Sequence, residues 1–132
     1  MDITGRCYCG QTHVSARSPK TVLSCHCADC RRSAGAPVTA FVEFKIADVD
    51  IQSDTLKSVT VNKGVTRSFC GNCGSPIAGT YDYLPGMTYI SLGVLDQAEK
   101  LEPITHAHYG SKYRWLHIAD DLPKEDEYRL DK

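Results

Sequence analysis

Seven cysteines, gathered in three short clusters, constrain this chain more than any other feature of its sequence. The clusters are the pair Cys7 and Cys9, the pair Cys70 and Cys73, and the triplet Cys25, Cys27 and Cys30. An odd number of cysteines suits a disulfide framework poorly, whereas thiols separated by one or two residues have the spacing of metal ligands. The clusters therefore predict a metal-binding protein.

The length of the chain fits one domain with its own hydrophobic core. It has 132 residues, of which 42% are hydrophobic and 23% are charged. We predict a single zinc-binding domain over residues 1–132, with a core from about residue 3 to residue 123. The segment 120–132 is mostly charged and is expected to lie loosely on the surface, with residues 124–132 as a C-terminal tail.

Charge and hydropathy exclude several classes of partner. The formal net charge of −1 argues against the basic surface that a nucleic-acid backbone requires. No apolar run approaches the roughly 18 residues that a membrane span requires, and residues 1–6 lack the basic start and apolar stretch of a signal peptide. We therefore expect a cytoplasmic protein with neither a nucleic-acid nor a membrane partner.

Short apolar stretches separated by turn residues predict a mainly β fold. Strands are expected over residues 3–7, 12–17, 21–25, 37–44, 55–61, 65–69, 77–81, 87–92 and 104–109. The Asn-Lys-Gly sequence at 62–64 is typical of a hairpin turn, and a short helix is expected over 28–34, ended by Gly35. Small β domains often pair through exposed edges, so a homodimer is compatible with this fold.

The two cysteine pairs together supply the four sulfurs of a closed, tetrahedral zinc site. Cys7 and Cys9 share one face of an extended segment because they are two residues apart. Cys70 and Cys73 flank a glycine-containing turn, which lets both sulfurs face one ion. Zinc bound there would join the N-terminal strands to the middle of the chain, so we predict a structural role.

The triplet Cys25, Cys27 and Cys30 supplies three thiolates, one fewer than a tetrahedral ion requires. Catalytic zinc sites keep such an open position, and a substrate thiol is a natural ligand for it because zinc favours the thiolate. Three thiolates on a divalent ion carry a net charge of −1. Arg31 and Arg32 directly follow the last cysteine, so they would either offset this charge or bind a carboxylate of the substrate.

Two alternatives to an open zinc site remain at this stage. An iron–sulfur cluster is one, although such clusters usually bind four cysteines. Closure of the site by a histidine is the other, and the candidates are His13, His106, His108 and His117. His26 is a poor candidate because it lies between two of the cysteines, so its side chain should point away from them.

Four motifs resemble the glutathione-dependent formaldehyde-activating enzyme family, which also includes centromere protein V. They are Gly-Arg-Cys-Tyr-Cys-Gly at 5–10, Cys-His-Cys-Ala-Asp-Cys-Arg-Arg at 25–32 with Gly35, Phe-Cys-Gly-Asn-Cys-Gly-Ser-Pro at 69–76, and a closing segment with Ser111, Lys112, Trp115 and Asp-Leu-Pro at 121–123. The resemblance implies a β-tent fold with two zinc ions per chain. It places a structural zinc on the two cysteine pairs and a second zinc on the triplet, where the thiol of glutathione approaches.

The resemblance also implies a carbon–sulfur lyase, which forms or breaks S-(hydroxymethyl)glutathione. Its substrates would be a glutathione-type thiol and a small aldehyde, and Lys112, His106 or His108 would supply the proton to the product oxygen. Two other functions remain open: a carrier that binds glutathione without catalysis, and a structural zinc module that binds a protein partner. A turnover assay separates the carrier from the enzyme, whereas an interaction module has no need of a metal with an open position.

Overall fold

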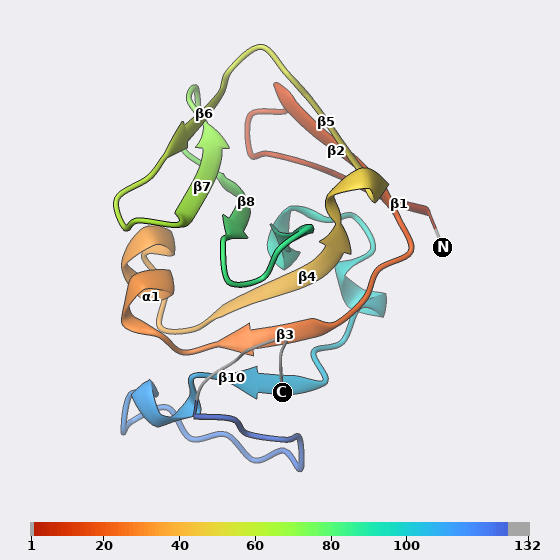
Figure 1. Ribbon diagram of the computed structural model, residues 1–132. Helices are drawn as coiled ribbons and strands as arrows, with labels where there is room; N and C mark the ends of the chain where they lie inside the picture. The colour runs from red at the N-terminus through yellow and green to blue at the C-terminus, as the bar shows by residue number, and fades with distance from the viewer. Residues whose placement is uncertain (1, 127–132) are drawn as a thin grey trace.

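The computed structural model describes residues 2–126, and the chain is mainly β, as the sequence predicts. Within these residues, ten strands form two sheets (Figure 1). The smaller sheet is antiparallel and has the order β1 (Asp2–Arg6), β2 (Thr12–Arg17) and β5 (Val49–Ser53). The larger sheet has the order β10 (Thr105–Ala107), β3 (Val22–Cys25), β4 (Thr39–Lys45), β9 (Met87–Ser91), β8 (Pro76–Tyr81), β7 (Val65–Cys70) and β6 (Leu56–Val59).

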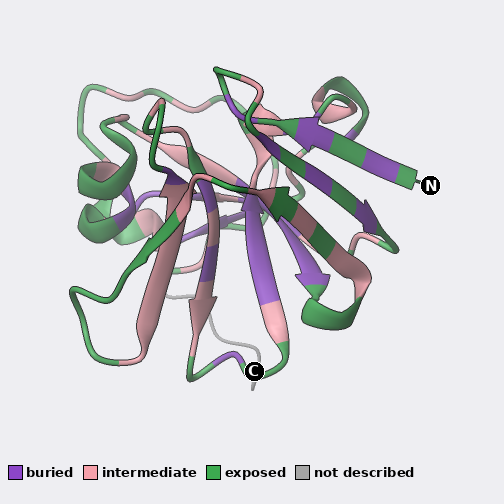
Figure 2. Cartoon of the chain, turned by 90° about the horizontal axis from the view of Figure 1, so that it is seen from above, coloured by how far each residue is buried: buried purple, intermediate pink, exposed green. Residues whose placement is uncertain are grey.

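Strand alternation in the smaller sheet places one face against the core. Buried and exposed residues alternate along β1 and β2, and Figure 2 shows this as alternating purple and green on the strand that begins at the N-terminus. Gly5 allows β1 to approach the loop around residue 95, because a Cβ at this position would overlap the carbonyl oxygen of Val94. Ile3 and Val14 therefore pack into the space between the sheets.

The buried side chains form two hydrophobic clusters. The larger cluster includes Ile3, Val14, Phe44, Ile77 and Ile90, and it also contains Cys7 and Cys70. The smaller cluster includes Leu23, Phe41, Leu84 and Tyr89, and it also contains Cys25 and Cys30. Each group of cysteines is thus anchored in a packed region of its own.

The single α-helix of residues 2–126, α1 (Ala28–Ala34), has the predicted bounds. Cys27 is its N-cap, and Gly35 ends it with a left-handed backbone (φ 65°) and an N–H that donates to the carbonyl of Arg31. The 3-10 turns are η1 (Ile46–Asp48), η2 (Leu92–Val94), η3 (Ala98–Lys100) and η4 (Tyr109–Ser111). No helix in the described part of the chain is both long and apolar enough to cross a membrane.

The C-terminal segment differs from the prediction. Residues 120–125 do not lie loosely on the surface, because the N–H of His106 donates to the carbonyl of Pro123 (2.9 Å) and the N–H of Glu125 donates to the carbonyl of His106 (2.9 Å). Strand β10 runs parallel to β3 and ends before His108, whose backbone is left-handed (φ 52°). Residues 127–132 of the predicted tail lie outside the described residues.

Candidate metal centres

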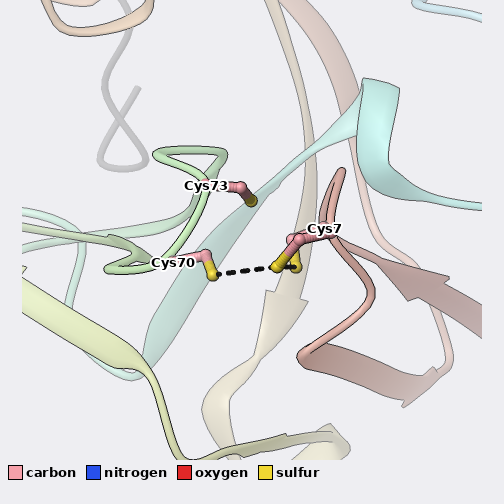
Figure 3. A group of neighbouring side chains, drawn as sticks. Cys7, Cys70 and Cys73 are labelled. Carbon is pink, nitrogen blue, oxygen red and sulfur yellow. Dashed lines mark hydrogen bonds between the residues drawn. The ribbon is translucent and has the colours of Figure 1, made fainter.

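The two cysteine pairs meet at one point, although they lie far apart in the chain. Figure 3 shows Cys7 on one segment of the chain, and Cys70 and Cys73 on another, with their side chains converging. The Sγ atoms of these three residues and of Cys9 all lie within 4.8 Å of one another. The sulfurs of Cys7 and Cys9 are 3.6 Å apart, and those of Cys9 and Cys70 are 3.8 Å apart.

These sulfur separations fit a tetrahedral metal site. With a Zn–S bond of about 2.3 Å, neighbouring sulfurs of a regular tetrahedron are about 3.8 Å apart. A disulfide would require about 2.05 Å. The donor set and its spacing therefore match a soft divalent cation such as zinc, held by two pairs of thiolates.

Two tight turns produce this convergence. Cys7 follows β1, and the N–H of Gly10 donates to the carbonyl of Cys7 (3.2 Å). Cys70 ends β7, and the N–H of Gly74 donates to its carbonyl (2.7 Å). Both glycines have a positive φ, 84° and 81°, which few other residues adopt without strain. Each turn aims two sulfurs at the same point.

Hydrogen-bond donors around the four-cysteine group favour thiolates. The hydroxyl of Thr55 lies 3.2 Å from the sulfur of Cys70 and lowers the pKa of that thiol to about 5. The hydroxyl of Ser75 lies 3.2 Å from the sulfur of Cys73 and lowers its pKa to about 7. Metal ligands must be deprotonated, so these donors suit metal binding.

The triplet forms a second group at the start of α1. Cys25 ends β3, Cys27 caps the helix and Cys30 lies in its first turn. Their three sulfurs lie within 4.8 Å of one another, and the N–H of Cys30 donates to the sulfur of Cys27 (3.3 Å). Cys25 and Cys30 are buried, whereas Cys27 is half-buried, so Cys27 is the member of the triplet that solvent reaches.

In the triplet, ionisation of one thiol opposes ionisation of its neighbours. Hydrogen bonds from Cys25 and Cys30 hold the pKa of the Cys27 thiol well below its usual range. The same hydrogen bond with Cys27, together with burial, raises the pKa of Cys25 far above its usual range. A divalent cation removes this conflict because it stabilises all three thiolates at once, so the donor set fits zinc.

His26 points away from the triplet, as its place between two cysteines predicts. Its side chain is fully buried, and its Nε2 lies 3.0 Å from Nδ1 of His106 on β10. Nε2 of His106 in turn lies 2.9 Å from a carboxylate oxygen of Asp120. Among residues 2–126, no histidine or carboxylate joins the three sulfurs within 4.8 Å.

The two predicted arginines have different surroundings. Arg31 donates to the backbone carbonyls of His26 and Ser111, and its guanidinium lies 4.2 Å from the ring centre of Tyr113. Arg31 therefore ties the C-terminal segment to the triplet. Arg32 is exposed and lines a cleft between α1 and the larger sheet. Binding of a substrate carboxylate by either residue stays a prediction.

Arg67 is a residue of this site that the sequence did not reveal. It lies on β7, and its Nη2 is 3.7 Å from the sulfur of Cys30, which is 37 positions away in the chain. Its guanidinium also lies 5.7 Å from the ring centre of Tyr81, whose pKa is raised above its usual range by burial. The pairing of strands places the Arg67 side chain beside the triplet. The spacing of the cysteines in the sequence therefore does not predict that Arg67 belongs to this site.

Comparison with known proteins identifies the family. The family model described as glutathione-dependent formaldehyde-activating enzyme matches residues 2–111. The chain belongs to this family. All seven cysteines lie within the matched stretch, so both sulfur groups belong to the part of the chain that the formaldehyde-activating family shares.

A solved structure shares the fold of this formaldehyde-activating family member. The crystal structure of a Rhodobacter sphaeroides protein superposes with a TM-score of 0.61 and 17% sequence identity. The likeness covers 70% of this chain and 87% of the other. No curated protein matches the chain.

Proposed function

We propose that this protein is a zinc-dependent carbon–sulfur lyase, which joins or splits a glutathione-type thiol and a small aldehyde at the triplet. The observation that supports this most directly is the gathering of three sulfurs within 4.8 Å, with Cys27 accessible to solvent. Three protein ligands are the number found in catalytic zinc sites, whereas structural sites have four. Membership of the formaldehyde-activating family supports glutathione and formaldehyde as substrates.

The three cysteines of the triplet have different roles in metal binding. Cys25 and Cys30 are fixed in the smaller hydrophobic cluster, so they hold the site rigid, while Cys27 forms its accessible edge. Zinc bound to the triplet would supply a positive charge that lowers the pKa of an incoming thiol. Arg67, beside Cys30, adds a fixed positive charge on the side of the larger sheet.

The reaction requires no oxidant, because one proton leaves the thiol and one reaches the oxygen. The thiol gives up its proton to solvent, its sulfur forms a bond to the carbonyl carbon, the carbon–oxygen π pair moves to the oxygen, and the oxygen takes a proton. The reverse reaction breaks the carbon–sulfur bond and returns the proton.

Among the three predicted proton donors, we assign His108. Lys112 donates to two backbone carbonyls, at 2.7 and 3.1 Å, and His106 lies between His26 and Asp120. The half-buried imidazole of His108, by contrast, lies within electrostatic reach of Cys27 and contributes, after the hydrogen bonds from Cys25 and Cys30, to the lowering of the Cys27 pKa. Its left-handed backbone (φ 52°) is a strained conformation of the kind that clusters at functional sites.

The four-cysteine group has a different role in this proposal. Four sulfurs complete a tetrahedral shell, which leaves no position for a substrate. We therefore assign it a structural zinc, which joins the turn after β1 to the turn after β7. Two zinc ions per chain follow from the two groups.

Zinc content per chain, measured with and without excess glutathione, tests the proposal. We expect two zinc ions in the wild type, one in Cys27→Ser, and perturbation by glutathione of the triplet zinc alone. Cys9→Ser is the matched control, because it should lose the other zinc and keep the glutathione response. Cys27→Ser should fold normally and lose activity; retained activity would contradict the mechanism.

The same measurement separates the alternatives. A glutathione carrier would show the zinc response without any acceleration of adduct formation above the uncatalysed rate. A structural interaction module would contain one zinc, or two that do not respond to glutathione.

A further inference from the structure

A large, mainly apolar cleft is connected to the triplet by Arg67, although none of the three cysteines is among its lining residues. It has a volume of about 860 Å³ and is bounded by α1, β4, β7 and β8. Its apolar lining includes Val38, Phe41, Val65, Phe69 and Ala78. Figure 1 shows α1 beside β7 and the turn that precedes it, and Nδ2 of Asn62 in that turn donates to a carboxylate oxygen of Asp29 on the helix (3.1 Å).

Arg67 connects the cleft to the triplet. Its side chain lines the cleft, and its Nη2 lies 3.7 Å from the sulfur of Cys30. The side chain is half-buried, so its charge acts in a region that water only partly screens. An oxygen that becomes negative during reaction at the triplet would therefore meet a positive charge at the border of an apolar space.

Formaldehyde makes no use of such a cleft. Formaldehyde carries no group besides its carbonyl, whereas pockets of several hundred Å³ with apolar walls and few polar groups typically enclose most of a larger ligand. Burying an alkyl chain against these walls removes apolar surface from water, which favours binding in proportion to the buried area. The cleft and Arg67 together fit a molecule with an apolar chain at one end and a carbonyl at the other.

We propose that the cleft binds the apolar chain of the carbonyl substrate, so that the site accepts alkyl aldehydes and prefers them to formaldehyde. This inference rests on the proposed function. The thiol gives up its proton to solvent and its sulfur bonds to the carbonyl carbon, while Arg67 donates a hydrogen bond to the carbonyl oxygen; the oxygen then takes a proton. The product is the hemithioacetal of glutathione and an alkyl aldehyde, formed without an oxidant or a reductant.

Binding of two unreactive thioethers tests the cleft without catalysis. We expect calorimetry to show that the zinc-loaded protein binds S-octylglutathione at least about tenfold more tightly than S-methylglutathione, because burial of two methylenes already gives a factor of this size. Ala34 is an exposed residue at the end of α1, and it lines the cleft. Ala34→Phe would place a bulky ring there and should reduce the preference for S-octylglutathione to below about threefold. Ala47→Phe, on exposed η1, is the matched control and should retain the preference.

Turnover completes the test. With glutathione, wild-type kcat/KM should be at least about tenfold higher for octanal than for formaldehyde, after subtraction of the uncatalysed rate. Arg67→Met should lower kcat/KM for both aldehydes by at least about tenfold, with the S-octylglutathione affinity kept.

The outcomes of the two experiments are distinguishable. Equal affinity for the two thioethers overturns the inference, even if the protein accelerates the reaction of formaldehyde. A preference for S-octylglutathione that Ala34→Phe abolishes, without acceleration of any aldehyde reaction, supports the cleft as an alkyl subsite and overturns the lyase proposal instead.

Discussion

Removal of metal from the four-cysteine group should destabilise the fold by an amount that the chain topology sets. The group joins Cys9 to Cys70, which are 61 positions apart. A cross-link that closes a loop of this length lowers the entropy of the unfolded chain by the equivalent of about 4 kcal/mol at 25 °C. A metal that joins the same two segments should stabilise the folded state by a similar amount.

Chemical denaturation with and without a chelator measures this contribution. We expect the free energy of unfolding of the wild type to fall by about 4 kcal/mol when the metal is removed. Cys27→Ser is the control that isolates the four-cysteine group, because it alters only the triplet. The chelator should therefore destabilise this variant by nearly the same amount as the wild type.

Two outcomes would refute this reasoning. If chelation changed the free energy of unfolding by less than about 0.5 kcal/mol, the four sulfurs would not act as a metal cross-link, since such a change is within the range of neutral surface substitutions. If chelation destabilised the wild type but not Cys27→Ser, the stabilising metal would lie in the triplet.

Three further predictions concern stability. Gly5→Ala should lower the free energy of unfolding by about 1–3 kcal/mol, because the added Cβ would overlap the carbonyl oxygen of Val94. Gly93→Ala is the control: its Cβ meets no atom within 4 Å, so its free energy of unfolding should stay within about 0.5 kcal/mol of the wild type. Arg31→Lys should speed hydrogen exchange in residues 105–111, because lysine cannot reproduce the planar fork that donates to two carbonyls. Burial, and then the electrostatic effect of His106, lowers the pKa of His26 to about 4. Between about pH 6.5 and pH 4, the unfolded chain therefore binds more protons at this residue than the folded chain does. Stability should fall as the pH falls through this window, and the slope should be shallower in His26→Gln.

Much of the fold follows from local sequence patterns. Strand β2 and helix α1 have the predicted bounds, and the turn at 62–64 joins β6 to β7 as predicted. These elements were predictable because alternation, a glycine C-cap and a turn sequence are local signals. Strand β5 was missed, although Val49 and Ile51 alternate with exposed residues, because the stretch is short and is defined by its pairing with β2.

The site was only partly predictable, for a related physical reason. Cysteine spacing is local, so the membership of the two sulfur groups could be expected from the sequence, and the structure gathers the same residues. The contact between Arg67 and Cys30 depends on which strand lies beside α1, and no spacing rule contains that information. The apolar cleft is likewise a product of how the helix lies against β7 and β8.

The C-terminal segment shows how much of the triplet depends on distant parts of the chain. Ala107 on β10 pairs with Cys25 on β3, and the N–H of His26 donates to the carbonyl of Ala107 (3.1 Å). His106 is held in turn by Asp120, beyond residue 111, where the family match ends. Because the backbone around Cys25 is fixed through this chain of contacts, residues after 111 help to set the positions of the sulfurs. Substitutions after residue 111 should therefore alter the positions of the sulfurs in this chain without changing any cysteine.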